Sequence, residues 1–159
     1  MSSNVDYDAI VVGAGFAGLA LIHHLRELGI SIRVFDKAND IGGTWAWNKY
    51  PGAATDSEGY YYCLTFSKEI MQEWTWSERY PGWEETLRYM HFVADKCNMW
   101  PDIQLNTEII SADFQNDTGL WLIRTADATE LTCKYFISDM GMISQPVIPN
   151  FKGRYKFQG

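Results

Sequence analysis

The chain has 159 residues, enough for one domain with a substantial core, and its formal net charge at pH 7 is −7. The acidic balance argues against nucleic acid and an anionic membrane surface as partners, and the short apolar runs argue against a membrane-spanning segment. The chain also starts without the basic and apolar regions of a signal peptide, and its three cysteines are far apart, so we expect a cytoplasmic protein with free thiols.

The first 36 residues follow the order of a dinucleotide-binding βαβ unit. A short apolar run leads into Gly13-Ala14-Gly15-Phe16-Ala17-Gly18, and an amphipathic pattern and a second apolar run then end in Asp36. A lone Gly-x-Gly-x-x-Gly motif is weak evidence, but here the preceding strand, the following helix and the terminal acid are all present. The sequence therefore predicts a strand over 7–12, a helix over 16–28 and a second strand over 32–35.

Each glycine of the motif has its own predicted role. Gly13 permits a tight turn, Gly15 lets the backbone approach a pyrophosphate, and Gly18 lets the helix pack close to the strand. The unpaired N–H groups and the positive dipole end of the helix then face the phosphates.

Asp36 stands 21 residues after Gly15, at the end of the second predicted strand. A carboxylate in this place can accept hydrogen bonds from both ribose hydroxyls of a dinucleotide, and it would repel a 2′-phosphate. The site is therefore predicted to take FAD or NAD and not NADP.

The helix over 16–28 is predicted to turn one apolar stripe toward the sheet. His23 and His24 lie in the middle of this helix without a partner at metal-ligand spacing, so we expect surface or edge histidines and no metal site. Gly29 follows as the stop signal of the helix. The predicted stripe consists of Ala17, Leu21, Leu25 and Leu28.

After Asp36 the chain does not continue into another βα repeat. It enters an aromatic, turn-rich segment from 39 to about 83, which is too long for an ordinary connection, and such segments are commonly functional. This segment holds a Gly-Thr-Trp-Ala-Trp-Asn-Lys-Tyr-Pro-Gly block over 43–52, followed by Asp56. The next predicted element is a helix that begins at Trp83 and ends before Pro101, with an apolar stripe of Leu87, Met90, Ala94 and Cys97.

The C-terminal half is rich in predicted strands. A strand over 103–109 is expected to lie parallel to the first two, and turn-like residues separate three further strands. The predicted fold class is α/β, a doubly wound, Rossmann-like parallel sheet with an inserted antiparallel β-meander. The meander strands are expected near 111–115, 120–125 and 130–138, and a Pro- and Gly-marked tail follows them.

Several motifs together identify a family. The 43–52 block, with the pattern Gly-Thr-Trp-x-Trp-Asn-x-Tyr-Pro-Gly, is highly specific, and it accompanies the glycine motif and Phe35-Asp36-Lys37-Ala38. Tyr62-Cys63 and Trp76-Ser77-Glu78-Arg79-Tyr80 are further matches. On these residues the chain, from about Asp6 onward, resembles the N-terminal part of the Baeyer–Villiger monooxygenases, the class B flavin monooxygenases, and within them the cyclohexanone monooxygenase branch.

The resemblance implies a chemistry. Such enzymes bind FAD tightly, carry a second Rossmann domain for NADPH, and use O2 to insert one oxygen beside a ketone carbonyl through a C4a-peroxyflavin, which gives an ester or a lactone. By this resemblance, residues 1–140 are the N-terminal part of an FAD-binding domain and residues 141–159 are a linker toward a missing NADPH-binding domain. The chain alone is then expected to be an inactive fragment, whose partners are a ketone, O2 and the missing C-terminal portion of the same enzyme.

The resemblance also implies roles for individual residues. Asp56 is expected to be the catalytic carboxylate beside the flavin, where it holds and charges a partner arginine. Trp45 and Trp47 are expected to stack on or wall off the isoalloxazine, and Gly43 with Thr44 to approach the flavin–ribityl region. The expected cofactor-binding residues are Gly13, Gly15, Phe16, Gly18, Asp36, Lys37, Gly43, Thr44, Trp45, Trp47, Thr55, Asp56, Tyr62 and Ile109.

Structural alternatives stay open for several of these residues. Trp45 and Trp47 could serve only as core residues, and Tyr62 as a packing tyrosine. Without the resemblance, Asp56 would be read as a solvated loop acid or a helix cap. The alternative functions are a different FAD or NAD oxidoreductase that shares the Rossmann start, and a non-catalytic nucleotide-binding module.

The chain departs from the family pattern in three places. Ala46 follows Gly-Thr-Trp where the family often has an aromatic residue. Asp139-Met140-Gly141 replaces an Ala-Thr-Gly-like turn, which we expect to alter a backbone contact to the nucleotide. Phe157-Gln158-Gly159 supplies only the first three positions of the family fingerprint, so the fingerprint histidine and the partner arginine are absent from this sequence.

Overall fold

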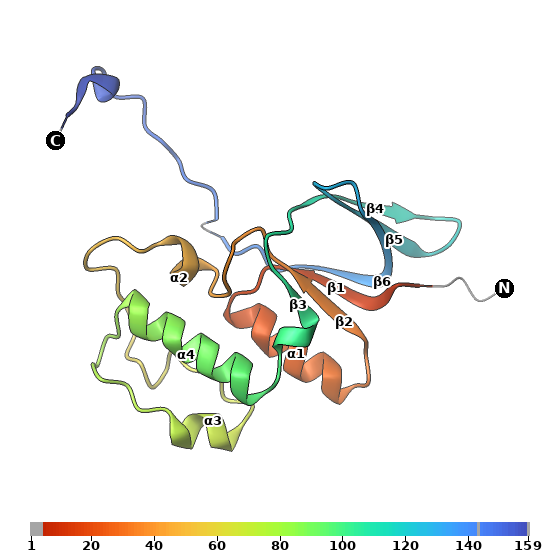
Figure 1. Cartoon of the computed structure of the whole chain (residues 1–159), viewed down its shortest axis with the longest axis horizontal. Helices are drawn as coiled ribbons and strands as arrows, with labels where there is room; N and C mark the ends of the chain where they lie inside the picture. Colours follow the sequence, from red (N-terminus) through yellow and green to blue (C-terminus); the bar gives the residue numbers. More distant parts are fainter. Residues whose placement is uncertain (1–4, 143, 159) are drawn as a thin grey trace.

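The chain folds around a six-stranded mixed sheet with helices packed against it (Figure 1). The computed structural model describes residues 5–142 and 144–158, so Gly159, the third position of the fingerprint, lies outside the described residues. The elements are β1 (Tyr7–Val12), α1 (Phe16–Glu27), β2 (Ile32–Phe35), α2 (Thr44–Trp47), α3 (Lys68–Glu73), α4 (Trp83–Lys96), the 3-10 turn η1 (Trp100–Asp102), β3 (Ile103–Gln104), β4 (Ile109–Gln115), β5 (Leu120–Thr125), β6 (Glu130–Ser138) and the 3-10 turn η2 (Arg154–Lys156). The strand order across the sheet is β3-β2-β1-β6-β5-β4.

The sheet has a parallel half and an antiparallel half. β1 lies between β2 and β6 and is parallel to both, with Val11 opposite Val34 on one side and Ile137 on the other, and β3 extends the parallel half beyond β2. β4, β5 and β6 form an antiparallel meander. The predicted Rossmann-like sheet with an inserted meander is therefore confirmed, and β6 belongs to both halves.

The two faces of the sheet bury different partners because successive side chains of a strand point in opposite directions. Ala9 and Val11 face the core that contains residues of α1, α3 and α4, whereas Ile10 and Phe35 pack against the meander residues Ile123 and Cys133. Figure 1 shows these helices together on one side of the sheet. The predicted double winding is therefore wrong for the described residues, because the meander rather than a helix covers the second face.

The apolar stripe predicted for α1 is only partly correct. Leu21 and Leu25 are half-buried and pack against the main core, but the other two predicted residues do not. Ala17 is exposed and Leu28, just beyond the helix, is 72% exposed, whereas the buried residues of α1 are Gly18, Leu19 and Ile22. Gly18 lies directly against the backbone of Gly13, the residue that follows β1, and this close approach sets the rotation of α1 about its axis.

The long segment over 39–83 is attached to α4 by polar side chains. The buried hydroxyl of Tyr89 accepts the Leu64 N–H at 2.7 Å, and the carboxylate of Glu85 accepts both the N–H and the hydroxyl of Ser77 at 2.8 Å. The predicted start at Trp83 is correct, but the predicted apolar stripe is only partly so. Met90 and Ala94 are buried, Leu87 and Cys97 are half-buried, and the rest of the buried face is Glu85, Thr86, Tyr89 and Val93.

The strand predicted over 103–109 is much shorter in the structure. β3 ends at Gln104, and Asn106 adopts a left-handed conformation with φ of 53°. The backbone N–H groups of Asn106 and Thr107 donate to the carbonyls of Ala38 and Asp36, so the chain leaves the sheet edge to brace the loop after β2. Ile109 then begins β4 instead of ending β3.

Beyond β6, residues 144–158 extend away from the sheet (Figure 1). The assignment of 141–159 as an interdomain linker stays a prediction. Among the described residues, the helices are too short and too polar to cross a membrane.

Candidate dinucleotide-binding site

Two glycine turns meet at the carboxyl end of the parallel strands. The first connects β1 to α1, and the second, Gly42-Gly43, precedes α2. The Gly42 N–H donates to the Ala14 carbonyl at 2.9 Å, which joins the two turns. Gly15 and Gly43 face each other across this contact, since a Cβ on Gly15 would lie 3.7 Å from the Gly43 Cα.

The packing of the chain itself explains two of the three motif glycines. Gly13 has φ of +119°, and a Cβ there would lie 2.2 Å from the carbonyl oxygen of Asp139. A Cβ on Gly18 would lie 2.2 Å from the carbonyl oxygen of Gly13. A side chain at Gly13 or Gly18 would place its Cβ against backbone atoms that cannot move easily. Glycine is therefore required at both positions even without a ligand.

Gly15 is different. Its φ of −84° suits any residue, and its Cβ would meet only the Gly43 Cα, at an ordinary van der Waals distance. The fold therefore leaves room for a side chain at Gly15, and the bare backbone there faces the start of α1. A ligand group that must approach this backbone closely, such as a pyrophosphate, would explain why position 15 is glycine.

Both carboxylate oxygens of Asp36 accept backbone N–H groups, and one of these groups belongs to the glycine loop. The Ala14 N–H donates to Oδ2 at 2.8 Å and the Ala38 N–H donates to Oδ1 at 2.9 Å, and the residue is 8% exposed. The sequence pattern indicates only a role of Asp36 toward a ribose, and the contact with Ala14 is visible only in the structure. A carboxylate has about four acceptor positions, so each oxygen can still accept a hydroxyl of a ligand.

Replacing Asp36 with alanine is expected to weaken FAD binding by about 1.5–3 kcal/mol, the scale of hydrogen bonds to a charged group. The same change should lower the thermal stability, because the Ala14 and Ala38 N–H groups lose their acceptors. Asp36→Asn, which keeps one acceptor oxygen, is the matched control. Its FAD affinity and its thermal stability should lie between those of wild type and the alanine variant. FAD titration followed by flavin fluorescence checks this; wild-type affinity in the alanine variant would show that the ribose does not bind at Asp36.

Three predicted aromatic contacts form one cluster at the start of α1. The Trp45 Nε1 donates to the Tyr62 hydroxyl at 3.1 Å, and the Phe16 ring meets the Tyr62 ring edge-on with centroids 5.0 Å apart. Trp45 is 7% exposed and belongs to the main core, whereas Trp47 is 60% exposed. The structure thus separates the two tryptophans, and their expected contact with the isoalloxazine stays a prediction.

A cavity of about 650 Å³ lies beside the loop that follows β2. Lys37 and Trp47 line it, as do residues 106–108 and 126–127. Lys37 and Trp47 were predicted from the sequence. The other lining residues were not, because β3 ends early and the turn between β5 and β6 folds back to this place, and neither feature has a local sequence signal. Lys37 contributes a positive charge to the lining, and Glu108 and Asp127 contribute negative charges.

Four further residues that were predicted to bind the cofactor lie outside the aromatic cluster and do not line this cavity. Asp56 is exposed, and within the described part of the chain its carboxylate forms no hydrogen bond or ion pair. Thr55 is buried; its N–H donates to the Pro81 carbonyl at 3.0 Å and its hydroxyl to the Ser57 carbonyl at 2.8 Å. The side chain of Ile109 packs in the cluster on the meander side of the sheet. Thr44 is the first residue of α2.

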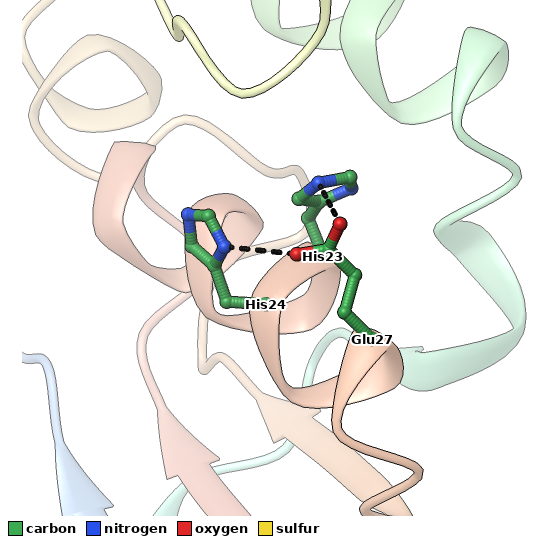
Figure 2. Close-up of side chains that lie close together, drawn as sticks. All are labelled: His23, His24 and Glu27. Atoms are coloured by element: carbon green, nitrogen blue, oxygen red, sulfur yellow. Dashed lines mark hydrogen bonds and ion pairs between the residues drawn. The ribbon is translucent and has the colours of Figure 1, made fainter.

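His23 and His24 do have a partner at helical spacing (Figure 2). The His23 Nε2 lies 3.5 Å from one carboxylate oxygen of Glu27, and the His24 Nδ1 lies 3.3 Å from the other. The three groups are close enough to suggest a metal site. However, ordinary (i, i+4) and (i, i+3) pairing on a helix explains the same geometry. We assign no metal, and the absence of one stays a prediction.

The parallel sheet, the glycine turn and the acid after β2 define a Rossmann-type dinucleotide-binding module. In agreement, residues 11–74 match the family model of the NAD(P)-binding Rossmann-like domain. The chain is 44% identical to the acetone monooxygenase (methyl acetate-forming) of Gordonia sp. (strain TY-5) over 99% of its own length and 30% of that protein. It is 41% identical to a Baeyer–Villiger monooxygenase of Pseudooceanicola batsensis over 97% of the chain and 28% of that protein.

A solved structure extends this likeness to the fold. The crystal structure of cyclohexanone monooxygenase from Rhodococcus sp. Phi1 bound to NADP+ matches with a TM-score of 0.92 at 35% identity, over 99% of this chain and 30% of that one. The chain is therefore homologous to a part of the Baeyer–Villiger monooxygenases, and it spans about 30% of the length of the relatives it matches.

Proposed function

We propose that the chain is the FAD-binding portion of an NADPH- and O2-dependent flavin monooxygenase that converts ketones into esters or lactones. The observation that carries the proposal is the bare backbone of Gly15 opposite Gly43, a space that the fold leaves open, with Asp36 held beside it. The name of one relative describes the same reaction class, since acetone is a ketone and methyl acetate an ester.

The residues of this chain would divide the work of holding FAD. The backbone N–H groups at the start of α1 bind the pyrophosphate at Gly15, and Asp36 accepts the hydroxyls of the adenosine ribose. The cavity beside Lys37 and Trp47 adjoins Asp36 and offers room for the adenine. When bound, FAD supplies the redox chemistry, accepting a hydride and reacting with O2.

Because of Asp36, we expect NADPH to bind to another part of the enzyme. The Asp36 carboxylate would repel the 2′-phosphate that distinguishes NADPH, so this module takes the flavin dinucleotide instead. We propose that Asp56, whose carboxylate is exposed, serves the flavin by pairing with an arginine that the present sequence does not supply. The ketone substrate and O2 would likewise meet their remaining binding groups outside this chain.

A cytoplasmic location is part of the proposal. The structure has free thiols at Cys63, Cys97 and Cys133, as expected in a reducing compartment. Burial raises the pKa of all three, that of Cys133 to about 11, so these thiols stay protonated and unreactive at neutral pH.

The purified 159-residue chain is expected to bind FAD and to show no NADPH-dependent ketone oxidation. FAD, NAD+ and NADP+ are titrated in parallel, and ester or lactone formation is measured with cyclohexanone and NADPH. Preference for NAD+ over FAD would favour a different oxidoreductase, and binding of none of the three would remove the dinucleotide site. Turnover well above background would contradict the fragment assignment, because hydride delivery would then need no further domain.

A further inference from the structure

Asp139 places a second carboxylate against the glycine loop. The residue follows β6; its N–H donates to the Val12 carbonyl at 2.9 Å, and its own carbonyl oxygen occupies the space where a Cβ on Gly13 would lie. The side chain points to the first turn of α1, since its Oδ2 is 3.6 Å from the position of a Cβ on Gly18. The backbone of Asp139 is therefore locked to the turn that would bind a pyrophosphate.

The first turn of α1 has no anion of its own. The helix begins after Gly15 without a capping side chain, and no acidic residue lies in its first turn. The start of a helix carries unpaired N–H groups and partial positive charge, which attract a negative group. The Asp139 carboxylate, whose Oδ2 lies beside Gly18 in this first turn, places a negative charge there.

The two acids at the loop are held differently. Asp36 accepts two backbone N–H groups, whereas the nearby Gly18 N–H is the group that lowers the pKa of Asp139. Burial raises the pKa of Asp139 above its ordinary value; the Gly18 N–H opposes this in part, and the negative charge of Asp36 adds to it. Among the described residues, Asp36, which follows β2, is the charged side chain that affects the pKa of Asp139.

We infer that Asp139 competes with the phosphates of a bound dinucleotide for the start of α1, so that binding is coupled to protonation of its carboxyl group. The inference rests on the proposed function, because it requires a pyrophosphate at this loop. The charged form repels the incoming phosphates and the neutral form does not. Affinity is therefore highest at low pH, falls as pH rises through the pKa of Asp139, and then stays on a lower plateau. At most one proton is taken up per dinucleotide.

The test compares Asp139→Asn, which has the same shape without the charge, with the wild-type chain. FAD affinity is measured from about pH 5 to about pH 8, and proton uptake is measured by calorimetry in two buffers of different ionisation enthalpy. The variant is expected to bind FAD about three- to tenfold more tightly than wild type at neutral pH, with a flatter pH profile and without the proton uptake. Asp117→Asn, in the turn between β4 and β5, makes the same change in net charge away from the loop and should behave as wild type.

Each outcome separates the possibilities. Equal pH profiles and equal proton uptake in wild type and Asp139→Asn would overturn the inference and leave the proposed function intact. Weaker binding by the asparagine variant, with unchanged thermal stability, would also overturn it, because Asp139 would then support the phosphate site. Absence of FAD binding in every variant at every pH would overturn the proposed function as well.

Discussion

Gly18→Ala is expected to destabilise the fold by about 3 kcal/mol or more, which is a large fraction of the stability of a typical domain. The added methyl group would lie 2.2 Å from the Gly13 carbonyl oxygen and 3.2 Å from its carbon, and both atoms belong to the backbone. Relief requires α1 to move away from β1, which would separate Leu19 and Ile22 from the sheet residues with which they share the core. Urea denaturation followed by circular dichroism measures the loss.

The control for this variant is Gly15→Ala in the same loop. Its methyl group meets only the Gly43 Cα at 3.7 Å, so its effect on stability should stay within about 1 kcal/mol. Equal urea midpoints for the two variants would contradict the view that Gly18 is required by the packing of α1 on β1.

Gly15→Leu is expected to abolish FAD binding, with a loss of affinity of at least about a hundredfold, while the chain still folds. The backbone conformation at Gly15 accepts any residue, and the space beside it is open in the protein alone. The leucine side chain would occupy the space between Gly15 and Gly43, where the phosphates must approach the backbone. FAD titration and the far-ultraviolet circular dichroism spectrum are measured on the same sample.

Gly15→Ala serves as the graded variant here. One methyl group fills part of the space, so an intermediate affinity is expected. If the leucine variant binds FAD as tightly as wild type, the pyrophosphate does not lie at Gly15. If it fails to fold, the alanine variant alone decides whether a side chain at this position weakens binding.

The two glycine variants test separate properties of one motif. Backbone packing requires glycine at position 18, whereas at position 15 the proposed ligand is the reason for glycine, although both residues satisfy the same sequence pattern. Gly13 belongs with Gly18, because its partner is the carbonyl of Asp139, which follows it by more than a hundred residues. The pattern alone does not distinguish packing from binding, since all three positions read as glycine.

The sequence by itself determined the elements whose signals are local. The glycine motif marks the turn after β1, and Asp36 marks the end of β2. Short apolar runs mark β5 and β6, and Gly119, with φ of +70°, marks the turn between β4 and β5. These signals act within a few residues along the chain, so the βαβ unit, the start of α4 and the meander were all predicted correctly.

Only the tertiary structure decided how these elements face one another. The contact of Gly18 with Gly13 sets the buried face of α1, and the hydrogen bonds of Glu85 and Tyr89 bury polar residues of α4 that an apolar pattern does not mark. The cavity beside Lys37 and the position of Asp139 depend on chain segments far apart in sequence. Such contacts depend on which backbones approach closely and which polar groups then find partners, and neither property is encoded by local spacing.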